Sequence, residues 1–262
     1  MYICCCTKIL FQLNYFVELA YNGTEFHGWQ VQPNAITVQE LINKAFSTVF
    51  RTPVEIIGAG RTDTGVHAMQ MFAHVELPEE FDKGVVLYKL NAILPDSIAI
   101  FNLIPVKEKA HARFDAMKRS YEYHISLVKD PFKTDTSWQL INKALNIAKM
   151  NEAAQILLTY TDFESFSRTN SDVKTFHCKI SRAEWVREAD SLIFYISADR
   201  FLRNMVRAIV GTLIEVGVGK TSLKDFRTIL ESKDRTKAGP SAPARGLFLT
   251  EVKYPSSIFI NE

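Results

Sequence analysis

A lone carboxylate lies inside a glycine-bounded turn. The residues from Gly60 to Met69 read GRTDTGVHAM, with Asp63 near the centre. Gly58, Gly60 and Gly65 are free to take backbone angles that other residues resist. Loops carried by a rigid sheet are the usual place of catalytic groups. Asp63 is therefore either a working acid or a turn-former that hydrogen-bonds its own backbone.

Three arginines recur at a helical spacing in a mostly apolar segment. Arg200, Arg203 and Arg207 occupy positions i, i+3 and i+7 of a helix predicted over 200–217, within an arc of about 60°. Guanidinium groups on one stripe suit phosphates, or a buried carboxylate held by a bidentate pair. The alternative is a solvated face. The apolar remainder of the helix favours a functional interpretation.

Two tyrosines alternate along a strand predicted over 118–128. Tyr121 and Tyr123 therefore share one face of the sheet. Two aromatic rings on one face usually indicate core. The functional alternative is that one ring stacks on a nucleobase, a contact worth roughly 1 to 3 kcal/mol.

A compact loop follows the first predicted strand. Residues 21–32, YNGTEFHGWQVQ, bring together glycines, the ring of Trp29 and the amide of Gln30. Flat rings and amides are groups that contact nucleotides. The segment is either a nucleotide-contacting loop or a well-packed turn.

The net charge and the cysteines limit which binding partners and which cellular compartment the sequence supports. The net charge is +2, so a nucleic-acid surface needs local clustering of Lys and Arg. Cys4, Cys5, Cys6 and Cys178 have neither zinc nor disulfide spacing, which favours a reducing, cytoplasmic setting. The apolar opening lacks the basic start of a signal peptide. No run approaches the roughly 18 apolar residues that a membrane span requires.

The sequence predicts no metal site and no cofactor motif. The histidines lack metal-ligand spacing. The string EVGVGKTS resembles a phosphate loop, but Ile214 occupies the position that requires glycine.

The predicted elements form two similar halves. In the first half, strands 13–21, 54–60, 69–77 and 98–106 alternate with helices 37–50 and 82–92. This βαββαβ order is the ferredoxin-like arrangement, an antiparallel sheet with helices on one face. The second half has strand 118–128, helical stretches within 137–160, strands 176–187 and 191–198, helix 200–217, a short helix from 222 and strand 246–254. Between the last two, residues 233–245 form a loop that either closes over a site or is a surface connection.

Several of these segments together resemble the tRNA pseudouridine synthase A family. The similar segments are YNGTEFHGWQVQ, GRTDTGVHA, RSYEY, FLRNMVR with the following VGVG, and APARGLFL, all in the family's order. The resemblance implies an α+β fold of two ferredoxin-like halves, 13–108 and 109–262, after an extension at 1–12. It implies that the two antiparallel sheets join into one extended sheet, with a catalytic cleft between the halves. It also implies a homodimer that binds the anticodon stem-loop of tRNA.

The resemblance also implies roles for individual residues. Asp63 matches the nucleophile, Tyr121 the aromatic that stacks on the target base, and Arg207 the partner that keeps the aspartate ionised. Leu247 matches an apolar contact under the base, and Arg61 would lie beside the flipped nucleotide. Further substrate contacts are expected at Arg203, Trp29 and Gln30.

The implied reaction converts uridines at tRNA positions 38, 39 and 40 to pseudouridine. It is an isomerisation and needs no cofactor or metal. Whether Asp63 attacks C6 or C1′, or takes a sugar proton to give a glycal, stays open. A competing hypothesis is a non-catalytic RNA-binding module with the same basic cleft. That module would gain nothing from an acid among phosphates.

Overall fold

The computed structural model describes residues 12–78, 80–169 and 173–260. Cys4, Cys5 and Cys6, and all but the last residue of the expected extension at 1–12, lie outside the described residues.

The first half of the chain builds four strands and two helices. They are β1 (Gln12–Tyr21), α1 (Val38–Phe50), β2 (Ile57–Gly58), β3 (His67–Pro78), α2 (Lys83–Ile93) and β4 (Ile98–Val106). Helix α1 starts where the Thr37 side chain accepts a hydrogen bond from the Glu40 amide, and α2 starts where Asp82 caps Val85 in the same way. The βαββαβ order is therefore as the sequence predicts.

The second half is longer and adds five strands and three helices. They are β5 (Lys118–Ser126), β6 (Trp138–Gln139), α3 (Ile147–Leu157), β7 (Ile180–Glu188), β8 (Ser191–Ala198), α4 (Met205–Gly217), α5 (Leu223–Ser232) and β9 (Leu247–Lys253). Short 3-10 turns lie at Pro131–Lys133, Glu164–Phe166, Arg235–Lys237, Ala244–Gly246 and Ser256–Ile258.

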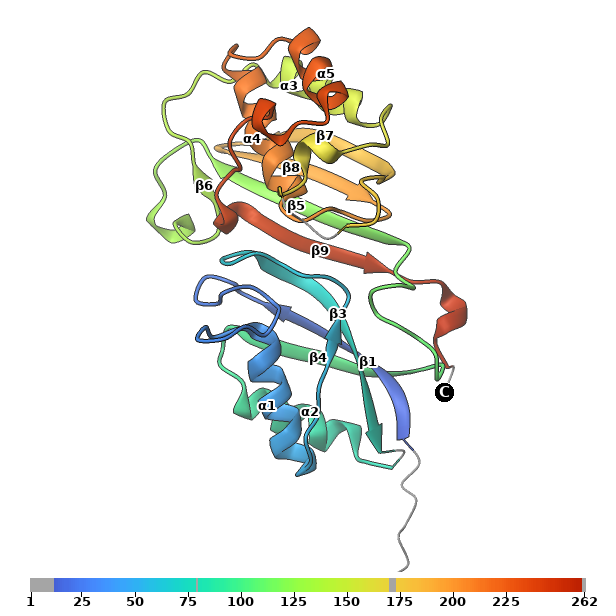
Figure 1. The fold of residues 1–262 in the computed structure, drawn as a ribbon. Coiled ribbons are helices and arrows are strands. Elements are labelled where there is room, and N and C mark those ends of the chain that lie inside the picture. The colour runs from blue at the N-terminus through green and yellow to red at the C-terminus, as the bar shows by residue number, and fades with distance from the viewer. Residues whose placement is uncertain (1–11, 79, 170–172, 261–262) are drawn as a thin grey trace, which may run out of the picture.

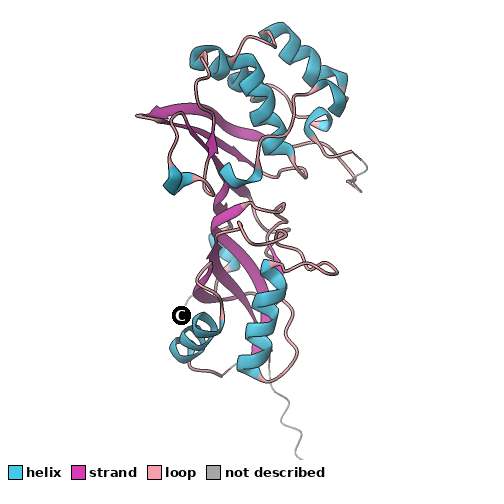
Figure 2. Cartoon of the chain, turned by 90° about the vertical axis from the view of Figure 1, so that its left-hand side faces the viewer, coloured by secondary structure: helices cyan, strands magenta, loops and turns pink. Residues whose placement is uncertain are grey.

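All of these strands join in one mixed sheet. The order is β4-β1-β3-β9-β5-β8-β7, with β2 paired to β3 and β6 paired to β5. Helices α1 and α2 accompany the first half, and α3, α4 and α5 the second (Figure 1). Seen from the side, the molecule is elongated, and strands run through the waist between its two helical ends (Figure 2). The predicted α+β fold with one extended sheet is confirmed.

The seam between the halves is a short parallel contact. Strand β9 comes from the end of the chain yet lies in the centre of the sheet, between β3 and β5. It pairs with β3 through only two residue pairs, His67 with Phe248 and Ala68 with Leu249. Parallel pairing at this seam, and between β5 and β6, departs from the predicted purely antiparallel sheets.

Two hydrophobic cores flank the seam. One contains Phe16, Phe46 and Met71 of the first half. The other contains Phe166 and Phe194 of the second half. Tyr121 packs against both clusters, which places this side chain where the two halves meet.

Four predicted elements differ from the structure by more than two residues, and one of them is the strand predicted over 176–187, which begins only at Ile180 as β7. The helix predicted over 200–217 begins only at Met205, because Asn204 has a left-handed φ of 66°. Within 137–160 the helix is confined to α3, since residues 138–139 instead pair with β5 as β6. The strand predicted over 54–60 is reduced to the two residues of β2. Over the described ranges, no helix is long and apolar enough to cross a membrane.

Candidate active site

The turn that carries Asp63 connects β2 to β3, two strands that pair with each other. The Val66 amide donates to the Asp63 carbonyl at 3.1 Å, which closes the turn. Of the three glycines expected to relax the backbone, Gly65 does so with φ +75°. Gly58 and Gly60 lie outside the left-handed region, so that part of the prediction is wrong. Gly58 instead makes room for the Trp29 ring, 2.5 Å from where a Cβ would lie.

The loop after β1 supports the Asp63 turn. The Trp29 amide donates to the Thr62 carbonyl at 3.3 Å, and the Gly65 amide donates to the Phe26 carbonyl at 3.2 Å. The hydroxyls of Tyr21 and Thr62 are 2.8 Å apart. A Cβ on Gly28, whose φ is +85°, would lie 2.4 Å from the Thr62 carbonyl oxygen. Only glycine permits this close approach, so the loop fixes the position of the turn.

The ring of Trp29 is packed inside the first half. Its side chain is 1% exposed and lies 6.1 Å, centroid to centroid, from the ring of Tyr21. This burial favours the well-packed turn at Trp29, and the expected substrate contact of its side chain stays a prediction. The neighbouring Gln30 is half-buried, and its substrate contact stays a prediction.

An ion pair joins the two halves at the seam. Arg207 Nη1 of α4 donates to Asp63 Oδ2 at 3.0 Å. The Arg207 Nε donates to the Ala242 carbonyl at 2.7 Å, and this second hydrogen bond orients the guanidinium group. The side chains of Asp63 and Arg207 are 24% and 21% exposed. The carboxylate is thus held by a charge-assisted hydrogen bond and is still accessible to a ligand.

Arg203 also approaches Asp63, although not from the predicted helix. Its Nε lies 3.9 Å from Asp63 Oδ1, and its side chain is 55% exposed. Arg200 and Arg203 precede the first residue of α4, so the predicted helical stripe is wrong. The Asp199 carboxylate explains the difference, because it accepts hydrogen bonds from the amides of Lys179 and Arg200 and holds this segment in a turn beyond β8.

Tyr121 projects from β5 beside this pair. Its ring is half-buried and meets Phe201 edge to face, with centroids 5.1 Å apart. Burial raises the pKa of Tyr121 to about 12, Arg119 opposes this shift, and the negative charge of Asp63 adds to it. The phenol is therefore protonated at neutral pH, and it is close enough to Asp63 to interact with its charge.

The loop at 233–245 lies along α4. The Gly239 amide donates to Thr212 Oγ1 at 2.9 Å, and the Ala242 amide donates to the Arg207 carbonyl at 2.9 Å. This loop supplies the carbonyl that orients the Arg207 side chain, a role that the sequence pattern did not indicate. It is neither a free surface connection nor a lid in this structure.

The remaining predicted contacts flank the pair. Leu247 opens β9 opposite Tyr123 and is 6% exposed, so most of its side chain packs into the second core. Arg61 is exposed, two residues before Asp63. Their substrate contacts stay predictions. Among the residues that the structure describes, no group of three His, Cys, Asp or Glu side chains is placed to hold a metal ion.

At the seam between the two halves, a partly open carboxylate held by an arginine thus lies beside a half-buried tyrosine. A family model described as tRNA pseudouridine synthase matches residues 19–115 and 153–255. The chain belongs to this family.

Close relatives carry one name. The chain is 53% identical over 247 residues to "tRNA pseudouridine synthase A" of Bacteroides fragilis, covering 94% of this chain and 98% of the relative. It is 51% identical over 246 residues to the protein so named in Parabacteroides distasonis, covering 94% and 97%. The protein of that name in Thermoanaerobacter pseudethanolicus is 39% identical over 243 residues, covering 92% and 99%.

Proposed function

We propose that this protein isomerises uridines at positions 38, 39 and 40 of the tRNA anticodon stem-loop to pseudouridine, with Asp63 as the nucleophile. The observation that carries the proposal is the 3.0 Å contact between Arg207 and Asp63 across the seam, beside Tyr121. Arg207 supplies a fixed positive charge to the carboxylate, and the partial exposure of Asp63 leaves room for a substrate atom.

The reaction balances without any added reagent. The bond from the ribose C1′ to the base N1 breaks, the uracil turns, and a bond from C1′ to C5 forms. The proton on C5 is lost, and N1 gains one. A carboxylate can assist by adding to the base or sugar, or by taking a sugar proton, and the chain offers Asp63 for each of these steps.

The target base must first leave the helical stack, which costs a few kcal/mol. In this proposal Tyr121 stacks on the flipped base, and Leu247 makes an apolar contact under it. Arg61 and Arg203 are exposed, and we propose that they bind the flanking phosphates. In this proposal the cleft between residues 13–108 and 109–262 receives the anticodon arm.

We infer that the functional unit is a homodimer in the cytoplasm, because the tRNA substrate is there and the family resemblance implies two copies. Sedimentation of the purified protein measures the number of copies, and a monomer at micromolar concentration with tRNA present contradicts the dimer.

The test of the proposed function is a modification map. Unmodified tRNA incubated with the protein, with no metal added, is expected to gain pseudouridine at positions 38 to 40. tRNA with cytidine at all three positions is the control and should gain none. Pseudouridine elsewhere, or none at all, contradicts the proposal.

Replacing Tyr121 with phenylalanine is expected to slow turnover by roughly tenfold while tRNA affinity is unchanged. The ring still stacks, but the variant lacks the protonated hydroxyl beside Asp63. We expect the rate to fall by the worth of one hydrogen bond from this hydroxyl to the substrate, about 0.5 to 1.5 kcal/mol. Single-turnover rates and tRNA binding measure the two effects. Tyr195→Phe is the matched control, because Tyr195 lies on β8 and stacks with Arg182. An unchanged rate for Tyr121→Phe contradicts a role for the hydroxyl.

A further inference from the structure

The short seam leaves the catalytic pair in need of another connection. Asp63 belongs to the first half and Arg207 to the second, and β3 and β9 join them through only two residue pairs. A small rotation about this seam would change the distance between Asp63 and Arg207. Other contacts across the seam must therefore hold the two halves in register.

His67 makes hydrogen bonds on both sides of the seam. Its Nδ1 accepts from the Gly23 amide at 3.0 Å. Its Nε2 lies 3.0 Å from the Asp135 carbonyl oxygen and 3.1 Å from that of Arg245. An amide can only donate and a carbonyl can only accept, so the ring is neutral and carries its proton on Nε2. The side chain is 1% exposed.

We call the hydrogen bonds of His67 across the seam the His67 bridge. Its first arm, the bond from the Gly23 amide to Nδ1, leads to Asp63. Gly23 begins the loop that donates to Thr62 and accepts from Gly65. Gly23 also lies against the Asp63 turn directly, because a Cβ at this position would be 2.0 Å from the Val66 carbonyl oxygen. A hydrogen bond that fixes Gly23 therefore fixes the turn that presents the carboxylate.

The second arm, formed by the contacts of Nε2 with the Asp135 and Arg245 carbonyls, leads to Arg207. Arg245 lies in the 3-10 turn that enters β9, three residues after Ala242, whose carbonyl accepts from Arg207 Nε. The Tyr123 hydroxyl donates to the intervening Pro243 carbonyl at 2.8 Å. Fixing the Arg245 carbonyl therefore restrains the short segment that orients Arg207.

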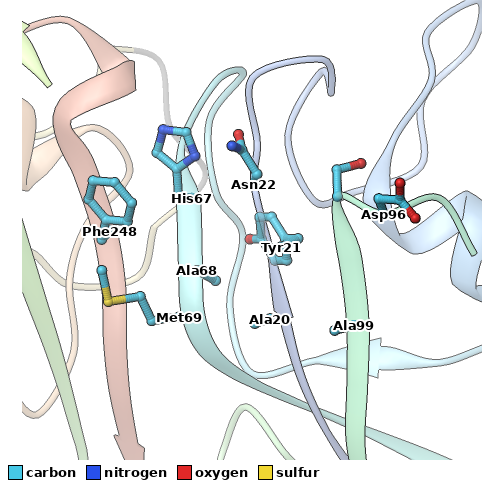
Figure 3. A pocket seen from close by; sticks show the side chains of 10 residues that line it. Ala20, Tyr21, Asn22, His67, Ala68, Met69, Asp96, Ala99 and Phe248 are labelled. Carbon is cyan, nitrogen blue, oxygen red and sulfur yellow. The ribbon is translucent and has the colours of Figure 1, made fainter. Parts of the chain in front are cut away.

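The surroundings hold the ring of His67 in one orientation. It stacks on Phe248 of β9, with centroids 4.5 Å apart and planes at 18°. Figure 3 shows His67 between Phe248 and Asn22, at the border of a pocket of about 270 Å³. Asp63 is not among the described residues that line this pocket. The bridge is thus distinct from the site where we place the substrate.

We propose that His67 is a positioning residue that holds Asp63 and Arg207 in register across the seam. The inference rests on the catalytic roles proposed for those two residues. A buried histidine that only filled core space would need neither the Gly23 amide nor two carbonyls from separate segments of the second half.

The charge state of the ring matters for this role. Burial lowers the pKa of His67, the Arg245 and Asp135 carbonyls and the Asp135 charge oppose the shift, and His124 adds to it. A proton on Nδ1 would face the Gly23 N–H and break the first arm. A neutral side chain at this position is therefore required by the bridge.

Three substitutions at position 67 test the bridge. His67→Leu removes both arms, His67→Asn is designed to keep the acceptor for Gly23, and His67→Gln is designed to keep the donor to the carbonyls. We expect His67→Leu to lower kcat by about 100-fold, the effect of a misplacement of about 1 Å. KM for tRNA is expected to stay within about threefold, because the substrate-binding groups are retained. The Asn and Gln variants should recover part of kcat.

His74→Leu is the matched control. His74 is a second histidine of β3, half-buried where His67 is fully buried, and its Nδ1 accepts from the Ala112 amide at 3.1 Å, outside the bridge. We expect both Leu variants to lower the unfolding temperature, and only His67→Leu to lower kcat. A kcat for folded His67→Leu equal to that of His74→Leu, or a loss confined to KM, overturns the proposal.

Two further outcomes separate the possible failures. If His67→Leu does not fold, a kcat equal to wild type in both His67→Asn and His67→Gln overturns the bridge. Asp63→Asn is measured in the same assay. Turnover by that variant contradicts the proposed nucleophile, whereas an inactive Asp63→Asn with a fully active His67→Leu contradicts the bridge alone.

Discussion

Replacing Asp63 with asparagine is expected to abolish pseudouridine formation, with a loss of roughly 10⁴-fold or more in single-turnover rate, as for other nucleophiles removed from enzymes. The amide has the shape of the carboxylate and keeps an oxygen that can accept from Arg207, so the site should be preserved. Binding of tRNA should survive, because Asp63 contributes no positive charge to the phosphates. Rates and dissociation constants are measured on the same protein sample.

The matched control is Asp96→Asn, which removes the same charge from an exposed aspartate outside the pair. It should leave both rate and affinity unchanged. Retained turnover by Asp63→Asn contradicts the nucleophile assignment. A loss of tRNA binding in that variant would instead indicate that Asp63 has a role in substrate binding.

Replacing Arg207 with methionine is expected to lower the rate by about 10²-fold. Removing one partner of a fully buried ion pair destabilises the remaining charge by about 3 to 5 kcal/mol. The partial exposure of Asp63 and Arg207 reduces this cost through solvent screening. The substitution also leaves the Ala242 carbonyl without the Arg207 Nε. Arg207→Lys should be intermediate, because it keeps the charge and loses the planar geometry that serves two acceptors at once.

Arg203→Met is the comparison for this prediction. Arg203 lies farther from Asp63, at 3.9 Å, and is more exposed. Its loss should chiefly weaken tRNA binding and reduce the salt dependence of that binding by about one phosphate contact. A larger loss of kcat from Arg203→Met than from Arg207→Met would show that the two roles are assigned the wrong way round.

The alternation of apolar residues and the helix caps predicted most of the elements. They predicted the βαββαβ order and placed Asp63 in the turn between two paired strands. The family resemblance brought Asp63, Tyr121 and Arg207 together before their geometry was known. Local physics alone left Asp63 undecided between an acid and a turn-former, since both suit a glycine-rich loop.

What the sequence could not show depends on long-range contacts. Residues 200–204 have a helical spacing of arginines, but the hydrogen bonds that the Asp199 carboxylate accepts and the left-handed φ of Asn204 override it. Trp29 is a residue type that contacts nucleotides, yet its ring fills the space left by the missing side chain of Gly58. The support that Ala242 gives to Arg207 joins residues that are 35 positions apart, through a backbone carbonyl that no side-chain pattern reveals.

The position of β9 has a consequence for the order in which the protein is made. The strand synthesised last is inserted in the middle of the sheet, between β3 and β5. A ribosome that has translated up to β8 has produced the Asp63 turn and Tyr121, but neither Arg207 nor the strand that joins the two halves. The joining of the two halves must therefore wait for the carboxyl-terminal segment, and a chain that ends before residue 247 lacks the strand that connects the half carrying Asp63 to the half carrying Arg207.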